Sequence, residues 1–385
     1  MIVEYKKITY IQYTNPAAYP PLQHSSRIFA KAGWKVLFLG TGSRGKSNSF
    51  EFPPHENIIV KRWKYYNPGI VQKIHYIIFS FWSAFIAWWC GSSWVYASDM
   101  MACPAAILAR NLFGIKIIYH EHDSPNRDSQ KETLFIKFLL RCRKYLAQKA
   151  EIVIFPNADR AKLYQEETGR IGPIEIVWNV PSMDELRFFK TNKPSHPVLF
   201  YHGSLNEARL PTSVLDALKL LDSNVSLVFA GYTAGISYDY GQWYLNEAKK
   251  RGLDNRVRYL GSLGDRVLLL AECSKASIGL ALMPKISNDI NMKHMVGASN
   301  KPFDYLVCGL DVIITDIPEW NDFYVTRGLA ISCNPENKDS IVDAIKKYTC
   351  LSSEKLVIGC KIFDILNSEW NYEFQFCDVY NKVSH

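Results

Sequence analysis

The chain lacks several features that mark whole classes of protein. Its nine cysteines form no CxxC pair and no cluster with histidine, which argues against a structural zinc site or a disulfide framework. The first residues, MIVEYKKITYIQY, contain no apolar segment followed by a small-residue cleavage site, so no secretory signal is predicted. No RNA- or DNA-binding motif is present. These absences predict a cytoplasmic protein that holds no metal and binds no nucleic acid.

Acidic residues are scarce at the amino end. Residues 1–98 carry eleven Lys or Arg side chains against three Glu, and the net charge of the whole 385-residue chain is +8. The excess charge therefore lies in this segment, and the remainder is neutral. A local positive excess favours a polyanionic partner such as an anionic membrane face. A solvated, lysine-rich surface is the simpler alternative.

What the chain does contain is an alternation of short β-branched or aromatic runs with longer helical stretches. Several of these runs are apolar at successive positions, as in strands that are buried on both faces of a parallel sheet. The alternation predicts an α/β protein with doubly wound sheets. The expected strands are 7–12, 35–40, 57–61, 93–97, 115–120, 151–155, 198–202, 225–230, 256–260, 277–283, 311–315 and 329–332.

The alternation is interrupted near residues 183–197, where two prolines and several polar residues occur. We therefore predict two Rossmann-like domains facing a central cleft, residues 1–185 and 186–362. Residues 363–385 form an aromatic, helical segment that we expect to return to the first domain. Ligands of open α/β sheets bind beyond the carboxyl ends of the strands, so the interdomain cleft is the expected site.

Residues Gly40–Ser47 read GTGSRGKS, which matches the phosphate-binding P-loop pattern and follows an expected strand. In a P-loop, however, the glycine-rich turn enters a helix. Here Pro53 and Pro54 follow within a few residues, and adjacent prolines do not fit a helix interior. A chance match in a surface loop is favoured, and a P-loop nucleotide-binding protein is kept as an alternative.

Residues 74–98 contain no formal charge, and 76–90 read YIIFSFWSAFIAWWC. This run is short for a membrane span. It is preceded by Arg62, Trp63 and Lys64, a mixture of cations and aromatics that is typical of surfaces lying in lipid headgroups. We expect these residues to contact a membrane, with a buried core helix as the alternative; residues 131–149 are a second basic amphipathic segment.

The sequence His120-Glu121-His122-Asp123 follows an expected strand, at the end where catalytic groups of α/β proteins lie. A histidine there can bind a substrate hydroxyl or act as an acid or base. A structural loop and a metal site are the alternatives, although no further His or Cys cluster supports a metal.

The segment 299–320 reads SNKPFDYLVCGLDVIITDIPEW. Ser299 and Asn300 can cap a helix with Pro302 in its first turn. A phosphate at that helix start would meet free N–H groups and the positive end of the helix dipole, with Lys301 close by. Asp304, one turn further on, could accept hydrogen bonds from ribose hydroxyls.

This segment resembles the donor-site helix of GT-B glycosyltransferases, especially the retaining family 4 group. The resemblance extends over nearly the whole chain, through Tyr201-His202-Gly203-Ser204 to Arg209, and through Phe155-Pro156-Asn157 and Trp178-Asn179-Val180-Pro181. It implies that Gly203, Ser204, Ser299, Asn300 and Asp304 bind the donor, that Arg209 and Lys301 neutralise its diphosphate, and that His122 reaches the sugar.

The chain also departs from the family's pattern. Val296 stands where the first glutamate of the Glu-x₇-Glu pattern is expected, and Ser204 stands where an arginine is expected. The usual glycine-rich loop of the first domain is replaced by residues 19–24, among them Gln23 and His24. With His120 and Glu121, these two are expected to contact the acceptor or the sugar.

The resemblance implies a transferase that moves a sugar from a nucleotide diphosphate sugar, without another cofactor, to a lipid-linked or glycan acceptor in bacterial surface polysaccharide or glycolipid assembly, with retained anomeric configuration. It would lie on the inner face of the plasma membrane. A catalytically silent GT-B scaffold is the second alternative.

Overall fold

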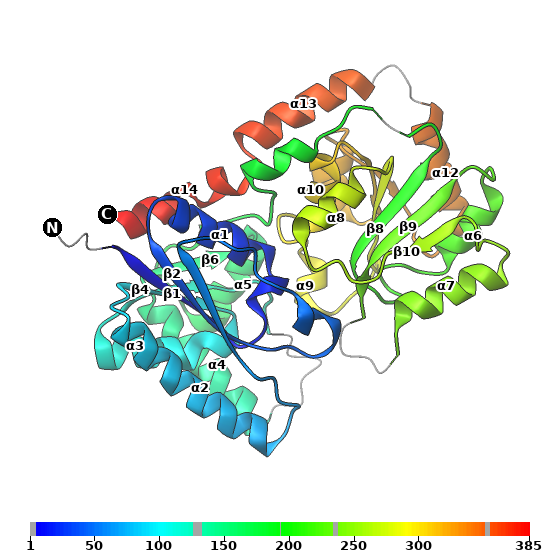
Figure 1. Cartoon of the computed structure of the whole chain (residues 1–385). Helices are drawn as coiled ribbons and strands as arrows, with labels where there is room; N and C mark the ends of the chain where they lie inside the picture. Colours follow the sequence, from blue (N-terminus) through cyan, green and yellow to red (C-terminus); the bar gives the residue numbers. More distant parts are fainter. Residues whose placement is uncertain (1–4, 126–132, 193, 234–237, 351–354) are drawn as a thin grey trace.

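The computed structural model describes residues 5–125, 133–192, 194–233, 238–350 and 355–385, and its strands form two parallel sheets (Figure 1). The first sheet has the order β3-β2-β1-β4-β5-β6-β7. Its strands are β1 (Lys7–Gln12), β2 (Lys35–Thr41), β3 (Ile58–Trp63), β4 (Trp94–Ser98), β5 (Lys116–His120), β6 (Ile152–Phe155) and β7 (Glu175–Ile176). The predicted strands lie within one or two residues of these; the two-residue β7 was not predicted.

The second sheet has the order β10-β9-β8-β11-β12-β13. Its strands are β8 (Val198–Ser204), β9 (Ser226–Tyr232), β10 (Val257–Tyr259), β11 (Ile278–Ala281), β12 (Asp311–Thr315) and β13 (Ile331–Cys333). In both sheets the chain enters at a central strand and reverses direction along the sheet, which is the doubly wound arrangement. The predicted fold class is therefore confirmed.

The helices cover both faces of each sheet. Those of the first half are α1 (Pro20–Lys31), α2 (Ile70–Trp89), α3 (Cys103–Phe113), α4 (Leu134–Lys149) and α5 (Ala158–Thr168). Those of the second half are α6 (Ser213–Leu220), α7 (Tyr240–Lys250), α8 (Arg266–Cys273), α9 (Ile290–Lys293), α10 (Asn300–Val307), α11 (Pro318–Trp320) and α12 (Lys338–Cys350). The last two helices are α13 (Lys355–Ser368) and α14 (Tyr372–Ser384).

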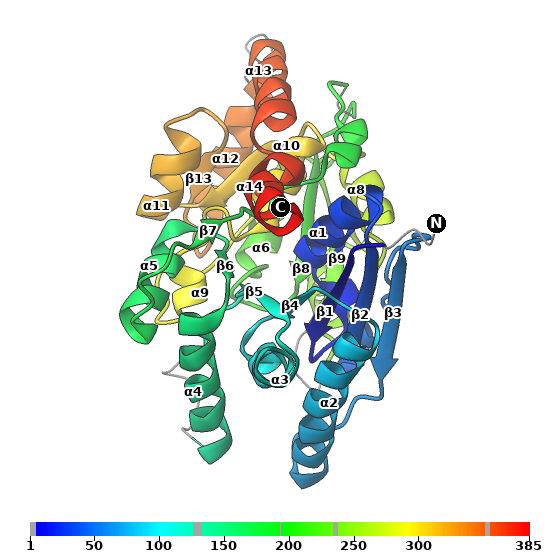
Figure 2. The same ribbon diagram turned by 90° about the vertical axis from the view of Figure 1, so that its left-hand side faces the viewer.

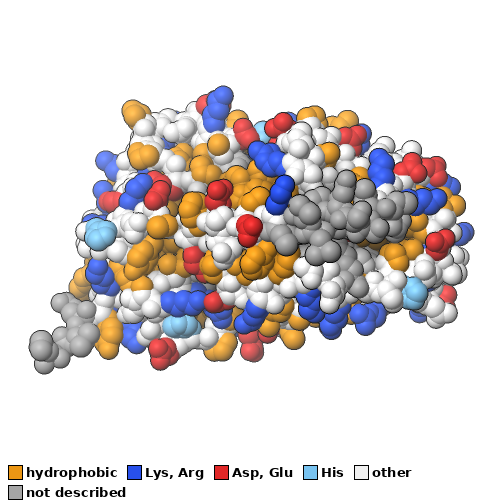
Figure 3. Space-filling view, turned by 90° about the horizontal axis from the view of Figure 1, so that it is seen from above, with side chains coloured by type: hydrophobic (Ala, Val, Ile, Leu, Met, Phe, Trp, Pro, Cys, Tyr) orange, Lys and Arg blue, Asp and Glu red, His pale blue; other side chains and the backbone are white. Residues whose placement is uncertain are grey.

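The chain crosses between the two halves twice. It first leaves the first sheet through η4, a 3-10 segment over Met183–Phe188, and it returns through α13 to α14, which packs on α1 (Figures 1 and 2). The rings of Phe29 and Phe376 meet at 5.8 Å, and Lys382 pairs with Glu175 at 2.6 Å. The face seen from above in Figure 3 carries acidic, basic and apolar side chains side by side.

The segment 40–47 does not form a P-loop. After β2 the chain makes only a short 3-10 turn, η2 (Gly45–Ser49), and no α-helix follows it before β3. The backbone N–H groups and helix dipole that a P-loop places at the phosphates are therefore not assembled. Lys46 instead pairs with Asp239 at the start of α7, 2.6 Å away.

The expected apolar helix is longer than the sequence indicated. It begins at Ile70 rather than near residue 76, and with 20 residues it is the one described helix that is long and apolar enough to cross a membrane. Only 33% of its most apolar 18-residue window is buried, so the alternative of a buried core helix is wrong. Length and composition alone do not make it a span.

Candidate active site

A cleft of about 370 Å³ lies between the two halves of the molecule. Its floor is formed where β8 and β9 end, at Gly203 and Gly231, and one wall is the start of α10. The opposite wall comes from the turn before α1, from the start of α1 and from Phe50, which follows η2. Among the residues lining it are the predicted donor-binding residues Gly203, Ser204, Arg209, Ser299, Asn300, Lys301 and Asp304, together with Gln23.

The first turn of α10 presents backbone donors to the cleft. Ser299 takes the N-cap position but makes no side-chain capping bond, so its side chain satisfies none of the first N–H groups of the helix. Those groups and the positive end of the helix dipole favour an anion at this position.

Two cations converge on the same region. Lys301 is buried, and burial together with Arg209 lowers its pKa well below the ordinary value. Gly203 has φ +111°, and a Cβ atom there would lie 3.1 Å from Cε of Lys301. A glycine at this position therefore admits the lysine to the cleft floor. The arrangement favours an anionic ligand, which would restore the charge of Lys301.

Asp304 is committed to a protein partner. Its carboxylate receives two hydrogen bonds from Arg266, 2.6 and 3.2 Å long, and Nε2 of His202 is 3.4 Å away. Burial raises the pKa of Asp304, and Arg266 opposes that rise. Each carboxylate oxygen thus already accepts one hydrogen bond from Arg266, and the expectation that Asp304 accepts ribose hydroxyls stays a prediction.

Arg266 continues this network toward the first domain. Its guanidinium also bonds both oxygens of Glu185 in η4, at 2.5 and 3.0 Å, and Glu185 lies 3.7 Å from His24 of α1. Burial acts against the charge of Glu185, but Arg266 and His24 outweigh it and lower its pKa. Burial lowers the pKa of His24 to about 4. His24 lies beside the crossover segment η4 and is not among the residues that line the cleft.

The histidines after β5 lie behind the cleft wall. His122 is buried against His120, with ring centroids 3.8 Å apart, and its neighbour Asp123 lines the cleft in its place. Burial and nearby Arg160 lower the pKa of His122 to about 3, so its ring is neutral at physiological pH. His120 bonds the hydroxyl of Tyr96.

Glu121 points away from the cleft. Its carboxylate pairs with the buried guanidinium of Arg143 at 2.5 and 2.7 Å and accepts the Tyr119 hydroxyl. Gln23 does line the cleft, and its amide donates to the carbonyl oxygen of Ala17.

Sequence reasoning missed three residues of this region: Arg160 and Arg266, which line the cleft, and Asp99, which holds the loop after β5. Asp99 follows β4 with φ +61°, and its carboxylate accepts the backbone N–H groups of His122 and Asp123. Burial and nearby Asp123 raise the pKa of Asp99 to about 7. Its place at a strand end was a usable signal. Arg160 and Arg266, in contrast, have no distinguishing context in the sequence.

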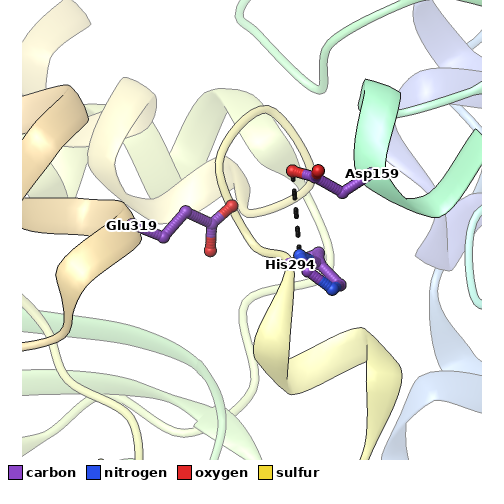
Figure 4. Close-up of side chains that lie close together, drawn as sticks. All are labelled: Asp159, His294 and Glu319. Atoms are coloured by element: carbon purple, nitrogen blue, oxygen red, sulfur yellow. Dashed lines mark ion pairs between the residues drawn. The ribbon is translucent and has the colours of Figure 1, made fainter. Parts of the chain in front are cut away.

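Arg160 joins the two halves at the cleft edge. It donates to the carbonyl oxygen of His122 on one side and to those of Asn291 and His294 on the other. Close to it, Asp159, His294 and Glu319 offer ligand atoms within 4.8 Å of one another (Figure 4). Nδ1 of His294 lies 3.7 Å from Oδ2 of Asp159.

Glu319 of this group is already engaged. Its two carboxylate oxygens accept the backbone N–H groups of Met295 and Val296. The Glu319 carboxylate thus holds the loop at residues 295–296, and this contact explains why the three side chains lie close together.

The predicted membrane-contact residues lie at the end of β3. Arg62 donates to the carbonyl oxygens of Asn48 and Phe50 and so holds η2, Trp63 is half-buried against Trp82, and Lys64 is exposed. Arg62 and Lys64 are both exposed, but Arg62 is engaged in hydrogen bonds with the η2 region.

The η2 turn reaches across the cleft. The ring of Phe50, which lines the cleft, packs so closely on Gly264 that a Cβ there would lie 2.4 Å from Phe50 Cδ1. Together with the Lys46–Asp239 pair, this contact closes the two halves on each other at the cleft edge.

Two doubly wound domains that face each other across a cleft form a GT-B fold, and here the N-terminus of α10 and the cations Arg160, Arg209, Arg266 and Lys301 line that cleft. No protein-family model matches the sequence, and no curated protein matches it significantly. Solved structures do match over nearly their full length.

HepE of Anabaena, determined with UDP and glucose, is 14% identical, with a TM-score of 0.71 over 99% of this chain and 100% of that one. Sucrose-phosphate synthase of Thermosynechococcus elongatus is 14% identical, with a TM-score of 0.69 over 98% and 99%. A glycosyltransferase of Rickettsia africae is 10% identical, with a TM-score of 0.68 over 98% and 99%. At these identities the likeness establishes the GT-B fold and does not distinguish among the families that share it.

Proposed function

We propose that this chain is a glycosyltransferase that uses a nucleoside diphosphate sugar as donor. The observation that carries the proposal is the meeting of Lys301, Arg209 and the first turn of α10 in one interdomain cleft. Cations and free N–H groups arranged in this way suit a diphosphate. HepE, which shares the fold, binds UDP and UDP-glucose, so a uridine diphosphate sugar is the first donor to test.

In the proposed reaction, the bond between the anomeric carbon and the diphosphate oxygen breaks, and its electron pair leaves with the nucleoside diphosphate. The acceptor hydroxyl oxygen bonds to the anomeric carbon, and its proton passes to the departing diphosphate. Lys301 and Arg209 stabilise the negative charge that develops on the leaving group, which is the largest contribution a preorganised site makes. The closed interdomain cleft excludes water from the reacting sugar.

The finer parts of the proposal concern the acceptor, the anomeric configuration of the product and the place where the protein acts. We assign acceptor binding to residues 1–185 and donor binding to 186–362, and propose a lipid-linked or glycan acceptor of bacterial surface polysaccharide or glycolipid assembly. Transfer proceeds with retention, as the resemblance to the family 4 group implies. The protein works at the inner face of the plasma membrane, in keeping with its basic amino end.

The first test is a thermal-shift screen with UDP, GDP, dTDP, ADP and CMP. One diphosphate is expected to raise the unfolding temperature, because a ligand that binds only the folded state stabilises it. Lys301→Ala should weaken that binding by about tenfold to a hundredfold, the worth of a charge-assisted bond to phosphate. Lys219→Ala, at an exposed lysine on α6, is the matched control and should bind as the wild type does.

A turnover assay then separates enzyme from scaffold. Release of the nucleoside diphosphate from its sugar nucleotide, lost in Lys301→Ala, supports the proposal. Binding of the diphosphate with no turnover of any sugar nucleotide would favour the silent scaffold instead.

A further inference from the structure

Helix α2 has an inverted distribution of side chains. Its buried positions are occupied largely by small or polar residues, Ser80, Ser83, Ala84 and Ala87, with Tyr76 and Phe79. Its large aliphatic and aromatic side chains face outward instead. The exposed ones are Ile70, Val71, Ile74, Ile77, Ile78, Phe81, Phe85, Trp88 and Trp89.

These outward side chains form one continuous stripe. They recur every three or four residues along the helix, which places them on one face. Ile70 is 77% exposed at one end of the stripe and Trp89 is 71% exposed at the other. A contiguous apolar surface of this length is a site of interaction with an apolar partner rather than an ordinary water-facing surface.

Helix α4 carries a second set of exposed apolar side chains. Its Phe135 packs on the inward face of α2, where its ring lies 5.3 Å from that of Tyr76, while Leu134 and Phe138 are 87% and 48% exposed. Figure 2 shows the first turns of α2 and α4 projecting from the same end of the first domain.

The segments that carry these exposed side chains have charges of one sign. No acidic residue occurs between Glu56 and Asp99, while Lys61, Lys64 and Lys73 are exposed in that interval. Helix α4 contains no acidic residue either, and Arg141 and Lys144 are exposed on it. An apolar stripe bordered by cations, with tryptophans at one end, complements the interface of a bilayer with anionic headgroups.

We propose that the exposed faces of α2 and the start of α4 dock the protein onto an anionic lipid bilayer, with α2 lying along the membrane surface. This surface partly replaces the Arg62–Trp63–Lys64 patch expected from the sequence, because Arg62 and Trp63 are engaged within the fold. The inference builds on the proposed function, since it names the partner surface that would carry the acceptor. Its test uses no sugar nucleotide, so the two proposals can fail separately.

The test is flotation of the full-length protein with vesicles of phosphatidylcholine, alone or mixed with phosphatidylglycerol. The wild type should bind the mixed vesicles and lose affinity as salt is raised. The double variant Ile74→Glu/Phe81→Glu should bind at least about tenfold more weakly, because two apolar contacts with the bilayer are replaced by charges. Ile171→Glu, at a position 95% exposed in the same domain, should bind as the wild type does.

A charge variant checks the electrostatic part. Lys64→Gln/Lys73→Gln should weaken binding to the mixed vesicles by about tenfold or more and leave binding to pure phosphatidylcholine unchanged. All variants change exposed positions, so their thermal unfolding should match that of the wild type.

Three results would overturn the proposal. The first is a wild type that floats with neither vesicle, or an Ile74→Glu/Phe81→Glu variant that floats as well as the wild type. The second is a wild-type dimer that this variant dissociates without any vesicle binding, which would assign the face to a second copy. The third is resistance of the cellular membrane-bound protein to alkaline carbonate, which would indicate a spanning helix.

Discussion

At the scale of single residues, the candidate site contains buried cations whose charged forms the protein stabilises to different degrees. Lys301 is buried beside another cation, Arg209, and its charge is disfavoured, whereas Arg266 is buried between two carboxylates and its charge is secured. An anion bound next to Lys301 would therefore stabilise its charge, whereas Arg266 already has two anionic partners. Removing the cation from a buried pair of this kind typically costs about 3–5 kcal/mol, so Arg266 contributes to the stability of the fold as well as lining the cleft.

This difference predicts a pH dependence of diphosphate binding. The pKa of Lys301 lies well below its ordinary value in the empty cleft, and a bound diphosphate raises it. Binding therefore takes up a proton above the depressed pKa. UDP affinity should be constant below that pKa and fall by up to about tenfold per pH unit above it.

The measurement is titration calorimetry with UDP across a series of pH values, in buffers of different ionisation enthalpy to count protons. Lys301→Met should abolish the slope as well as weaken binding. A slope that persists in Lys301→Met would assign the proton to another group and remove the argument for Lys301.

At the scale of elements, the short segment η2 overlaps the stretch that matches a P-loop pattern and for which the sequence favoured a surface loop. Its function in the fold is contact: Asn15 donates to the carbonyl oxygens of Ser47 and Phe50, and Phe50 rests on Gly264 of the opposite half. The segment is thus anchored in one domain and packed on the other.

Gly264→Ala tests this contact. The added methyl group would meet the Phe50 ring, and overpacking of this kind costs about 1–3 kcal/mol. The thermal unfolding temperature should fall, and the double variant Phe50→Leu/Gly264→Ala should recover part of the loss. An Ala variant as stable as the wild type would show that the two halves do not close on each other here.

The elements also show what the sequence could and could not predict. Continuous apolar runs such as WVYAS and DVIIT predicted buried parallel strands correctly. A strand that is buried on both faces is apolar at successive positions, and this pattern can be read from the local sequence alone. The start of α10 was equally readable, since caps and first-turn prolines are local. The pairing of Asp304 with Arg266, 38 residues earlier, could not be predicted, because it is fixed only by the tertiary fold.

The inversion of α2 was hidden for a related reason. Its sequence is apolar on nearly all sides, so periodicity could not say which face turns inward. The structure decides, because α3 packs against the face with the small side chains and leaves the large ones outside.

At the scale of the whole molecule, the two domains are held together by the Asp304–Arg266–Glu185 network and by contacts across the cleft edge. The Lys46–Asp239 pair is one of these contacts, and both side chains are partly exposed. Exposed pairs contribute about 1 kcal/mol or less. Lys46→Ala should therefore change unfolding only slightly and leave the UDP-induced thermal shift in place.

This outcome separates the two nucleotide-binding hypotheses. A P-loop protein would lose nucleotide binding in Lys46→Ala, because the lysine of that motif contacts the phosphates. Loss of the thermal shift in Lys46→Ala, with the shift retained in Lys301→Ala, would transfer the site from the interdomain cleft to residues 40–47. Asp239→Asn removes the other charge of the pair and should have the same small effect as Lys46→Ala.

The return of α14 to α1 has a consequence for biosynthesis. The apolar side of α1, with Phe29, is covered by residues near the carboxyl end, including Phe376. On the ribosome, this side stays uncovered until α14 has been synthesised, while the intervening half has already emerged and can fold. A chain that stops before α14 therefore exposes an apolar surface that chaperones and proteases recognise, and α14 is needed to cover it.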